Sequence, residues 1–242
     1  MSTRHDWQDA IEAGDVNAIR EMASSQEIDK IWIHGTPIDW AIMANQPASV
    51  TTLLDLGATV HFHHLMAAAH GDTPEIIGIL LDHGAQADAQ DQYGDTALMK
   101  AARKGNAGCV NMLLSKGANP DLVDRHGQTA LHHALVDGNQ EICQALAAIV
   151  DISVTDEIGW NYLMYAAIQQ RTDTCHLLME RGIPLDGKAP DGRSLAQLCA
   201  PTVLSSLATW QKARNDQTAL EQIAERSRPG LAHQEPRRKP GL

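Results

Sequence analysis

The sequence predicts an all-α repeat solenoid, a stack of about six to seven helix-turn-helix units with protruding hairpin fingers. One observation is an internal repeat, because similar phrases beginning at Gly94, Gly127, Gly159 and Gly192 follow one another every 32 to 33 residues. Pairs of leucines, such as the pair at Leu113, recur with the same period. The third observation is composition, since only 4% of residues are aromatic and 43% are hydrophobic. Self-similarity at this period is typical of solenoids, and small aliphatic side chains suit closely packed helices.

Each unit is expected to begin with a short amphipathic helix. Thr96 and Thr129 open the Thr-Ala-Leu phrases and are good helix N-cap residues. The pair Ala101 and Ala102 is small enough to let neighbouring helices approach closely.

The second helix of each unit carries the leucine pair, and a glycine such as Gly117 follows it in the place of a left-handed C-cap. The next stretch, residues 118–124, holds turn residues and is expected to form a protruding finger. No unit can bury its apolar face alone. Stacking therefore buries a continuous core and leaves a long concave face.

These phrases resemble the ankyrin repeat, whose pattern Gly-x-Thr-Pro-Leu-His-x-Ala-Ala-x-x-Gly is nearest at residues 127–138. The resemblance covers roughly residues 4–210 and includes Thr36-Pro-Ile-Asp-Trp-Ala as an earlier repeat. It implies a single ankyrin-repeat domain over residues 1–225, with an N-terminal cap at about residues 4–30.

Three departures from the repeat pattern predict local distortion. The interval from Gly57 to Gly84 is six residues short of the period, so a truncated finger is expected near residues 59–64. Val150 stands where the C-cap glycine is expected. Gln170 stands where a glycine is expected after the first helix of its unit.

The C-terminal end is predicted in two parts. A helix over about residues 202–225 is expected to cap the stack. Residues 226–242 hold three prolines, two glycines, five basic residues and one acidic residue, without apolar periodicity. We interpret them as a disordered basic tail.

Charge and composition exclude several classes of protein. The net charge of −11 has the opposite sign to that of a compact nucleic-acid binder, so no nucleic-acid partner is expected. No stretch approaches the roughly 18 uncharged apolar residues that span a bilayer. The first residues also hold no apolar signal core. We therefore expect a cytoplasmic monomer without a membrane partner, and four cysteines do not make a disulfide framework.

Acidic residues dominate the N-terminal half. No lysine or arginine occurs between Lys30 and Lys100. The acidic residues of this window are Asp39, Asp55, Asp72, Glu75, Asp82, Asp88, Asp91 and Asp95. They predict a continuous negative field along this half of the stack. These acidic residues either form a solvated outer face that keeps the protein soluble or steer a basic partner toward the stack.

In ankyrin-like folds a partner usually meets the fingers and the inner face of the first helices, and the resemblance places those positions here. The partner-binding candidates are Trp32, Ile33, Gln92, Tyr93, Asp95, Arg103, Lys104, Arg125, His126, Gln128, Val136, Asp137, Glu157, Ile158, Trp160, Ile168 and Gln169.

Two groups among these candidates stand out. The aromatic residues Trp32, Tyr93 and Trp160 are candidate anchors, because interfaces are enriched in such side chains. The alternative for Trp32 and Trp160 is packing between adjacent fingers. The basic residues predict a small positive spot that suits a carboxylate of the partner, unless it is a solvated face. They are Arg103, Lys104, Arg125 and His126.

Other chemistry has little support. The densest histidine cluster lies near His70 and consists of His61, His63 and His64; no cysteine lies near enough to complete a four-ligand zinc site, so no metal is expected. His132 occupies the family's usual histidine position, which implies a structural role. The cysteines of the second helices are interpreted as small buried hydrophobic residues, namely Cys109, Cys143 and Cys175. No hydrolase elbow, phosphate-binding loop or paired zinc motif is present, so we expect neither an enzyme nor a cofactor.

The sequence therefore predicts a non-catalytic protein-protein interaction module that binds through its concave face and fingers. Its most concrete form is a cytoplasmic inhibitor or immunity-type protein for a partner with a basic surface. The alternative, suggested by the basic proline-rich tail, is an adaptor or secreted effector that docks onto cellular proteins.

Overall fold

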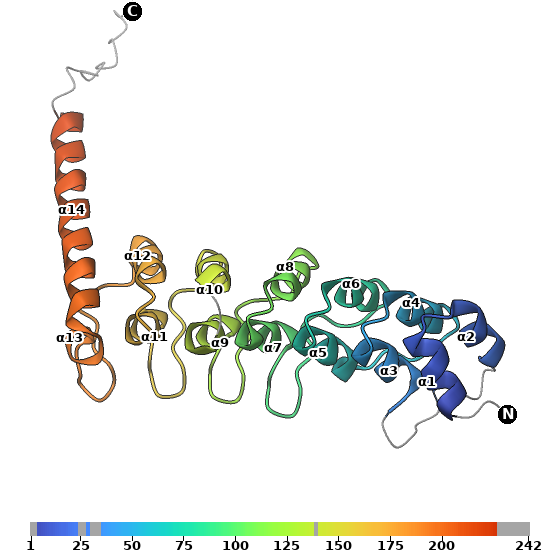
Figure 1. Cartoon of the computed structure of the whole chain (residues 1–242). Helices are drawn as coiled ribbons and strands as arrows, with labels where there is room; N and C mark the ends of the chain where they lie inside the picture. The colour runs from blue at the N-terminus through green and yellow to red at the C-terminus, as the bar shows by residue number, and fades with distance from the viewer. Residues whose placement is uncertain (1–3, 24–27, 30–34, 138–139, 227–242) are drawn as a thin grey trace, which may run out of the picture.

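The chain forms an elongated stack of paired helices (Figure 1). The computed structural model describes residues 4–23, 28–29, 35–137 and 140–226. Within these ranges there is no β-strand, and isolated bridges join Thr155 to Asn161 and Lys188 to Ser194. The predicted all-α repeat solenoid is thereby confirmed.

The helices pair in chain order, and each pair is one unit of the stack. The pairs are α1 (Arg4–Glu12) with α2 (Val16–Met22), α3 (Pro37–Met43) with α4 (Pro47–Asp55), α5 (Phe62–His70) with α6 (Pro74–Asp82), α7 (Ala97–Lys104) with α8 (Ala107–Ser115), α9 (Ala130–Asp137) with α10 (Gln140–Ala147), α11 (Tyr162–Ile168) with α12 (Thr172–Glu180), and α13 (Leu195–Leu198) with α14 (Pro201–Arg226). Odd-numbered helices form one layer and even-numbered helices the other, so that α7 packs between α5 and α9 (Figure 1).

Helix α7, the first of its unit, begins and ends as its residues predict. At α7 the hydroxyl of Thr96 accepts the backbone N–H of Met99 at 3.2 Å, and Gly105 ends the helix with a φ of +78°. The alanine pair, Ala101 and Ala102, is fully buried. The core therefore runs without interruption from unit to unit.

Three long connections between units form the fingers that bear on function. They are the 83–96 finger before α7, the 116–129 finger before α9 and the 148–161 finger before α11. By contrast, only residues 56–61 connect α4 to α5, so the finger expected to be truncated is short in the structure. At its end the N–H of His61 donates to Nδ1 of His64 at 3.1 Å, which caps α5.

Adjacent fingers are joined by backbone hydrogen bonds. The N–H of Arg125 donates to the carbonyl of Tyr93 at 3.0 Å, and the N–H of Glu157 donates to the carbonyl of His126 at 2.8 Å. The next finger, residues 181–194, has Pro190 at the corresponding position, and proline has no N–H to donate. The ladder between fingers therefore ends at the 148–161 finger.

Two expected distortions have a different form. Gln170 adopts a φ of +56°, so it keeps the left-handed conformation that Gly105 has in the corresponding place, and the unit is not distorted there. Val150 is fully buried and its N–H bonds to Leu146, just as the N–H of Ala118 bonds to Leu113. Val150 thus fills the position of Ala118. The glycine between helix and finger is simply missing, which accounts for the shorter 32-residue interval.

The last helix, α14, packs its first half on the stack and then projects beyond it (Figure 1). Val203 and Leu207 are buried, and the ring of Trp210 stacks on that of His176 with centroids 5.2 Å apart. None of the helices in the described ranges combines the length and apolar content needed to cross a membrane. The basic tail was predicted over residues 226–242; Arg226 is the last residue of α14, and residues 227–242 lie outside the described residues.

Candidate partner-binding surface

The predicted contact residues fall at two levels of each unit. At the fingertips, Tyr93 and Ile158 are 60% and 56% exposed. The polar residues there are also open to solvent, namely Gln92, Arg125, His126 and Glu157. The backbone ladder places these tips side by side. Trp160 is half-buried, with its ring edge-on to Tyr165 of α11 at 5.4 Å.

The second level is the last turn of the first helices. It contributes Arg103 and Lys104 from α7, Val136 and Asp137 from α9, and Ile168 and Gln169 from α11. Val136 and Ile168 are 40% and 37% exposed. The candidates Trp32 and Ile33 lie outside the described residues.

An aspartate closes each of the three fingers, which the sequence analysis missed. Oδ1 of Asp91 accepts the backbone N–H groups of Tyr93 at 2.8 Å and Asp95 at 3.0 Å. Asp124 and Asp156 make the corresponding pairs of bonds in the next two fingers. Each carboxylate therefore satisfies the turn that displays the fingertip residues.

The second oxygen of each aspartate reaches the first helix of its own unit. Oδ2 of Asp91 lies 2.8 Å from Nζ of Lys100, and Oδ2 of Asp124 lies 3.0 Å from Nε2 of His133. At Asp156 the partner is the hydroxyl of Tyr165, which donates at 2.6 Å. The three partners occupy one position of the repeat, nine residues after the aspartate. Three different chemistries thus lock successive fingers to their helices.

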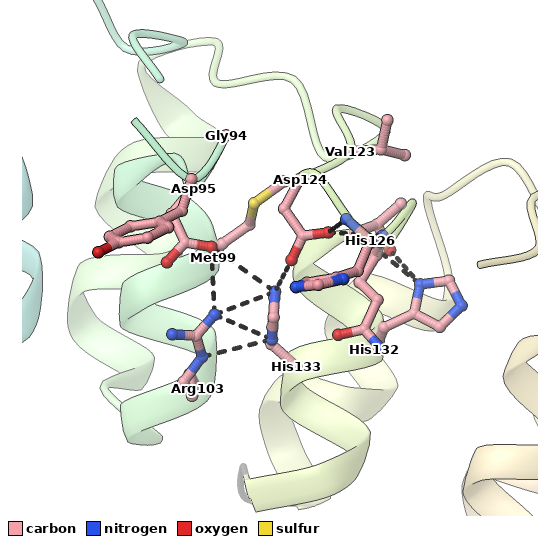
Figure 2. Close-up of polar contacts among 12 residues, drawn as sticks. Gly94, Asp95, Met99, Arg103, Val123, Asp124, His126, His132 and His133 are labelled. Carbon is pink, nitrogen blue, oxygen red and sulfur yellow. Dashed lines mark hydrogen bonds and ion pairs between the residues drawn. The ribbon is translucent and has the colours of Figure 1, made fainter. Parts of the chain in front are cut away.

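Two buried side chains, Asp95 and His133, hold the guanidinium of Arg103 in place (Figure 2). Its Nη2 lies 3.1 Å from Oδ1 of Asp95, and its Nε donates to Nδ1 of His133 at 3.3 Å. Burial and the Arg103 charge both lower the pKa of His133, opposed by Asp124 and Asp95, so the imidazole is neutral and can accept this bond. Asp95 was predicted as a contact residue. It is only 5% exposed, and its carboxylate binds Arg103 and Lys100.

The acidic window is extensively paired. Five of its eight acidic residues form ion pairs or hydrogen bonds with a basic side chain: Asp39 with His63 and His64, Asp55 with His83, Asp82 with Lys116, and Asp91 and Asp95 with Lys100. Lysines from beyond the window supply several of these partners. At Asp82, Asp91 and Asp95, whose partners are charged, the negative charge is therefore less continuous at short range than the sequence suggests.

The histidine cluster is built around Asp39. Nε2 of His63 and Nε2 of His64 lie 3.2 and 3.1 Å from Oδ1 of Asp39. Burial alone would raise the pKa of Asp39, but the His64 ring beside it and the hydrogen bonds from Thr36 hold it well below its usual range. Nδ1 of His64 accepts the N–H of His61, so the ring proton belongs on Nε2, facing Asp39. With this tautomer the protonated Nε2 is 3.1 Å from the carboxylate as an electrostatic contact, without the alignment of a hydrogen bond.

The cysteines of the second helices are fully buried, as their positions predict. Burial raises the pKa of the Cys109 and Cys175 thiols to about 12, and it also raises the pKa of Cys143. Such thiols carry almost no thiolate near neutral pH.

The comparisons with known proteins agree with this geometry. A family model described as ankyrin repeats in three copies matches residues 62–124 and 109–189. The ankyrin repeat domain of Bcl-3, of the IkappaB protein family, has a TM-score of 0.72 and 21% identity over 84% of this chain and 97% of its own. The human ASB11 ankyrin repeat domain has a TM-score of 0.69 and 22% identity over 84% and 96%.

A bacterial structure is also similar. An ankyrin repeat domain from Acinetobacter baumannii AYE has a TM-score of 0.65 and 25% identity over 74% of this chain and 99% of its own. Ankyrin repeats are in general protein-protein interaction modules. The repeat period, the paired helices and the family match together show that the chain belongs to the ankyrin repeat family.

Proposed function

We propose that this chain is a non-catalytic protein that binds a partner protein across its three fingers and the last turns of α7, α9 and α11. One observation carries the proposal: exposed apolar side chains lie on the first and third of these fingers and at the ends of α9 and α11, in a chain with few aromatic residues. They are Tyr93, Val136, Ile158 and Ile168. Apolar anchors surrounded by charged groups are typical of contact surfaces.

The finger aspartates strengthen the proposal. Asp91, Asp124 and Asp156 each tie a fingertip to a helix, so the contact residues are already ordered before a partner arrives. A preorganised surface loses less conformational entropy on binding than a mobile one.

In its most concrete form, the protein is a cytoplasmic inhibitor or immunity-type protein that covers the functional face of a basic partner. The net charge of −11 supports attraction of such a partner at long range. The ion pairs of Asp82, Asp91 and Asp95 weaken that field close to the surface. The alternative, an adaptor or secreted effector, depends on residues 227–242.

The test is capture of the partner from the native cells by the full chain at two salt concentrations, followed by affinity measurement with variants. Tyr93→Ala combined with Ile158→Ala should weaken binding by about 100-fold, since each removes an exposed anchor. The matched control is Leu56→Ala, because Leu56 is 40% exposed just after α4, outside the three fingers and the ends of α7, α9 and α11. Equal affinity of the double variant and wild type would contradict the proposed surface.

The same capture separates the finer functions. A single basic protein that is lost at high salt supports the inhibitor. A partner whose capture requires residues 227–242 supports the adaptor instead.

A further inference from the structure

A shallow hollow of about 290 Å³ lies between α5 and α7 and is lined only by basic side chains. His70 comes from the end of α5, whereas Lys100, Arg103 and Lys104 come from α7. It lies beside the proposed partner-binding surface, because Arg103 and Lys104 belong to both.

Two of the three cations that line the hollow are paired with aspartates. Lys100 pairs with Asp91 and Asp95 at 2.8 and 3.0 Å, and Arg103 pairs with Asp95. Lys104 is exposed and makes no ion pair within the described part of the chain. Asp124 lies close behind as well, because its carboxylate and that of Asp95 are both near His133, within 4.8 Å of one another. Among the described residues, the unpaired cation of the hollow is therefore Lys104 alone, and one such cation matches one carboxylate better than a doubly charged phosphate.

Arg103 is preorganised to meet that carboxylate. Its Nε and Nη2 are fixed by His133 and Asp95, whereas Nη1 has no hydrogen-bond partner among the described residues. Its side chain is 38% exposed. A guanidinium that is already held in place loses little entropy when it donates to a ligand.

An exposed apolar residue lies on the finger that precedes the same helix. Tyr93 is 60% exposed at the tip of the finger that leads into α7. A partner segment that extends from the end of α7 to this fingertip would be able to contact Arg103 and Lys104 with an acidic side chain and pack an apolar side chain on Tyr93.

We propose that this hollow binds an aspartate or glutamate side chain of the partner, so that an acidic segment with apolar neighbours anchors the partner here. The inference rests on the proposed function and specifies its chemistry. A partner that is basic overall meets this anchor through a local acidic segment.

The test uses a capped Leu-Glu-Leu tripeptide titrated into the full chain and followed by the backbone amide NMR signals of residues 70, 100, 103 and 104. Its glutamine and phosphoserine counterparts are titrated in parallel. We expect saturable shifts at these signals with the glutamate peptide, with weaker binding by both counterparts. Lys104→Glu should weaken glutamate-peptide binding by about tenfold, the loss of one charge-assisted hydrogen bond. Lys212→Glu, at an exposed position on α14, should leave it unchanged.

Three results would overturn the carboxylate site: no saturable shift at these signals, equal binding of the glutamate and glutamine peptides, or indifference to Lys104→Glu. Tighter binding of the phosphoserine peptide would also overturn it, in favour of a phosphate site. If the peptide does not bind but Tyr93→Ala with Ile158→Ala still weakens partner binding, only the carboxylate site is ruled out. If the peptide binds but that double variant leaves partner binding unchanged, the proposed partner-binding surface is ruled out and the carboxylate site stands.

Discussion

Burial sets the protonation state of His132 at the start of α9. The side chain is fully buried, and its Nδ1 accepts the N–H of Thr129 at 3.0 Å. Burial lowers the pKa of His132 from 6.5 to about 4, so the folded protein holds the neutral ring. The unfolded chain binds the proton more readily than the folded one between these two values. The free energy of unfolding should therefore fall as pH drops from about 6.5 to about 4, which urea denaturation at a series of pH values measures.

A substitution isolates the contribution of this residue. Met99 and Met164 occupy the same position in the neighbouring units, so His132→Met replaces the imidazole with a side chain that the fold accepts there. The variant should lose part of the pH dependence between pH 6.5 and 4, while His133, whose pKa is also lowered, keeps the remainder. An unchanged pH profile would show that His132 does not titrate in this way.

Gln170 is strained where its counterpart in another unit is a glycine. Its φ of +56° is in the left-handed region, which costs an L-residue energy that glycine does not lose. Gln170→Gly should raise the free energy of unfolding by about 1 kcal/mol, measured by urea denaturation. The matched control is Gln169→Gly, because Gln169 has a φ of −79° and should lose stability. A loss of stability in both variants would contradict the strain.

At the scale of elements, close backbone contact between fingers depends on glycine. A Cβ at Gly127 would lie 2.9 Å from the backbone nitrogen of Glu157 in the next finger. Gly127 also has a φ of +71°, so Gly127→Ala combines backbone strain with displacement of the ladder. We expect it to lower the free energy of unfolding by roughly 2–3 kcal/mol.

Gly117→Ala is the matched control for this contact. Gly117 has a φ of +87°, but a Cβ there would meet nothing within 4 Å. It should lose only the cost of the left-handed backbone, about 1 kcal/mol. Equal losses in urea denaturation of the two variants would show that the finger-to-finger contact adds nothing.

The sequence predicts these elements well where a residue type repeats. The Thr caps, alanine pairs and leucine pairs recur with the period, and they suffice to predict the paired helices. The link between each finger and its helix could not be predicted in this way, because Lys100, His133 and Tyr165 share a position but not a residue type. The position of Val150 within the repeat could not be predicted either. The glycine before it is missing, and a missing residue shifts the alignment of the repeat without leaving a residue that marks the shift.

The candidate surface was predictable to a similar degree. The family resemblance is enough to name the fingertip positions, and Tyr93 and Ile158 are exposed there. It did not predict that Asp95 is buried as a support for Arg103, since that depends on an imidazole from the next unit. Ion pairs between units also make the local surface charge differ from what the sequence window suggests, because Asp82 pairs with Lys116 of the next unit.

At the scale of the whole molecule, the stability of a stack of units depends on the contacts that cap its ends. Each unit contacts mainly its neighbours, so loss of the terminal contacts should open the adjacent units first. Leu207 of α14 is fully buried where this helix packs on α12. We expect Leu207→Ala to destabilise that end by about 2–5 kcal/mol, the usual loss for a buried leucine. In hydrogen exchange of the full chain, protection should fall in α11 and α12 and persist in α5 to α8.

Thr209→Ala, at an exposed position two residues further along α14, should change protection little. A uniform loss of protection along the stack would instead mean that the units unfold as one, and that α14 does not act as a local cap.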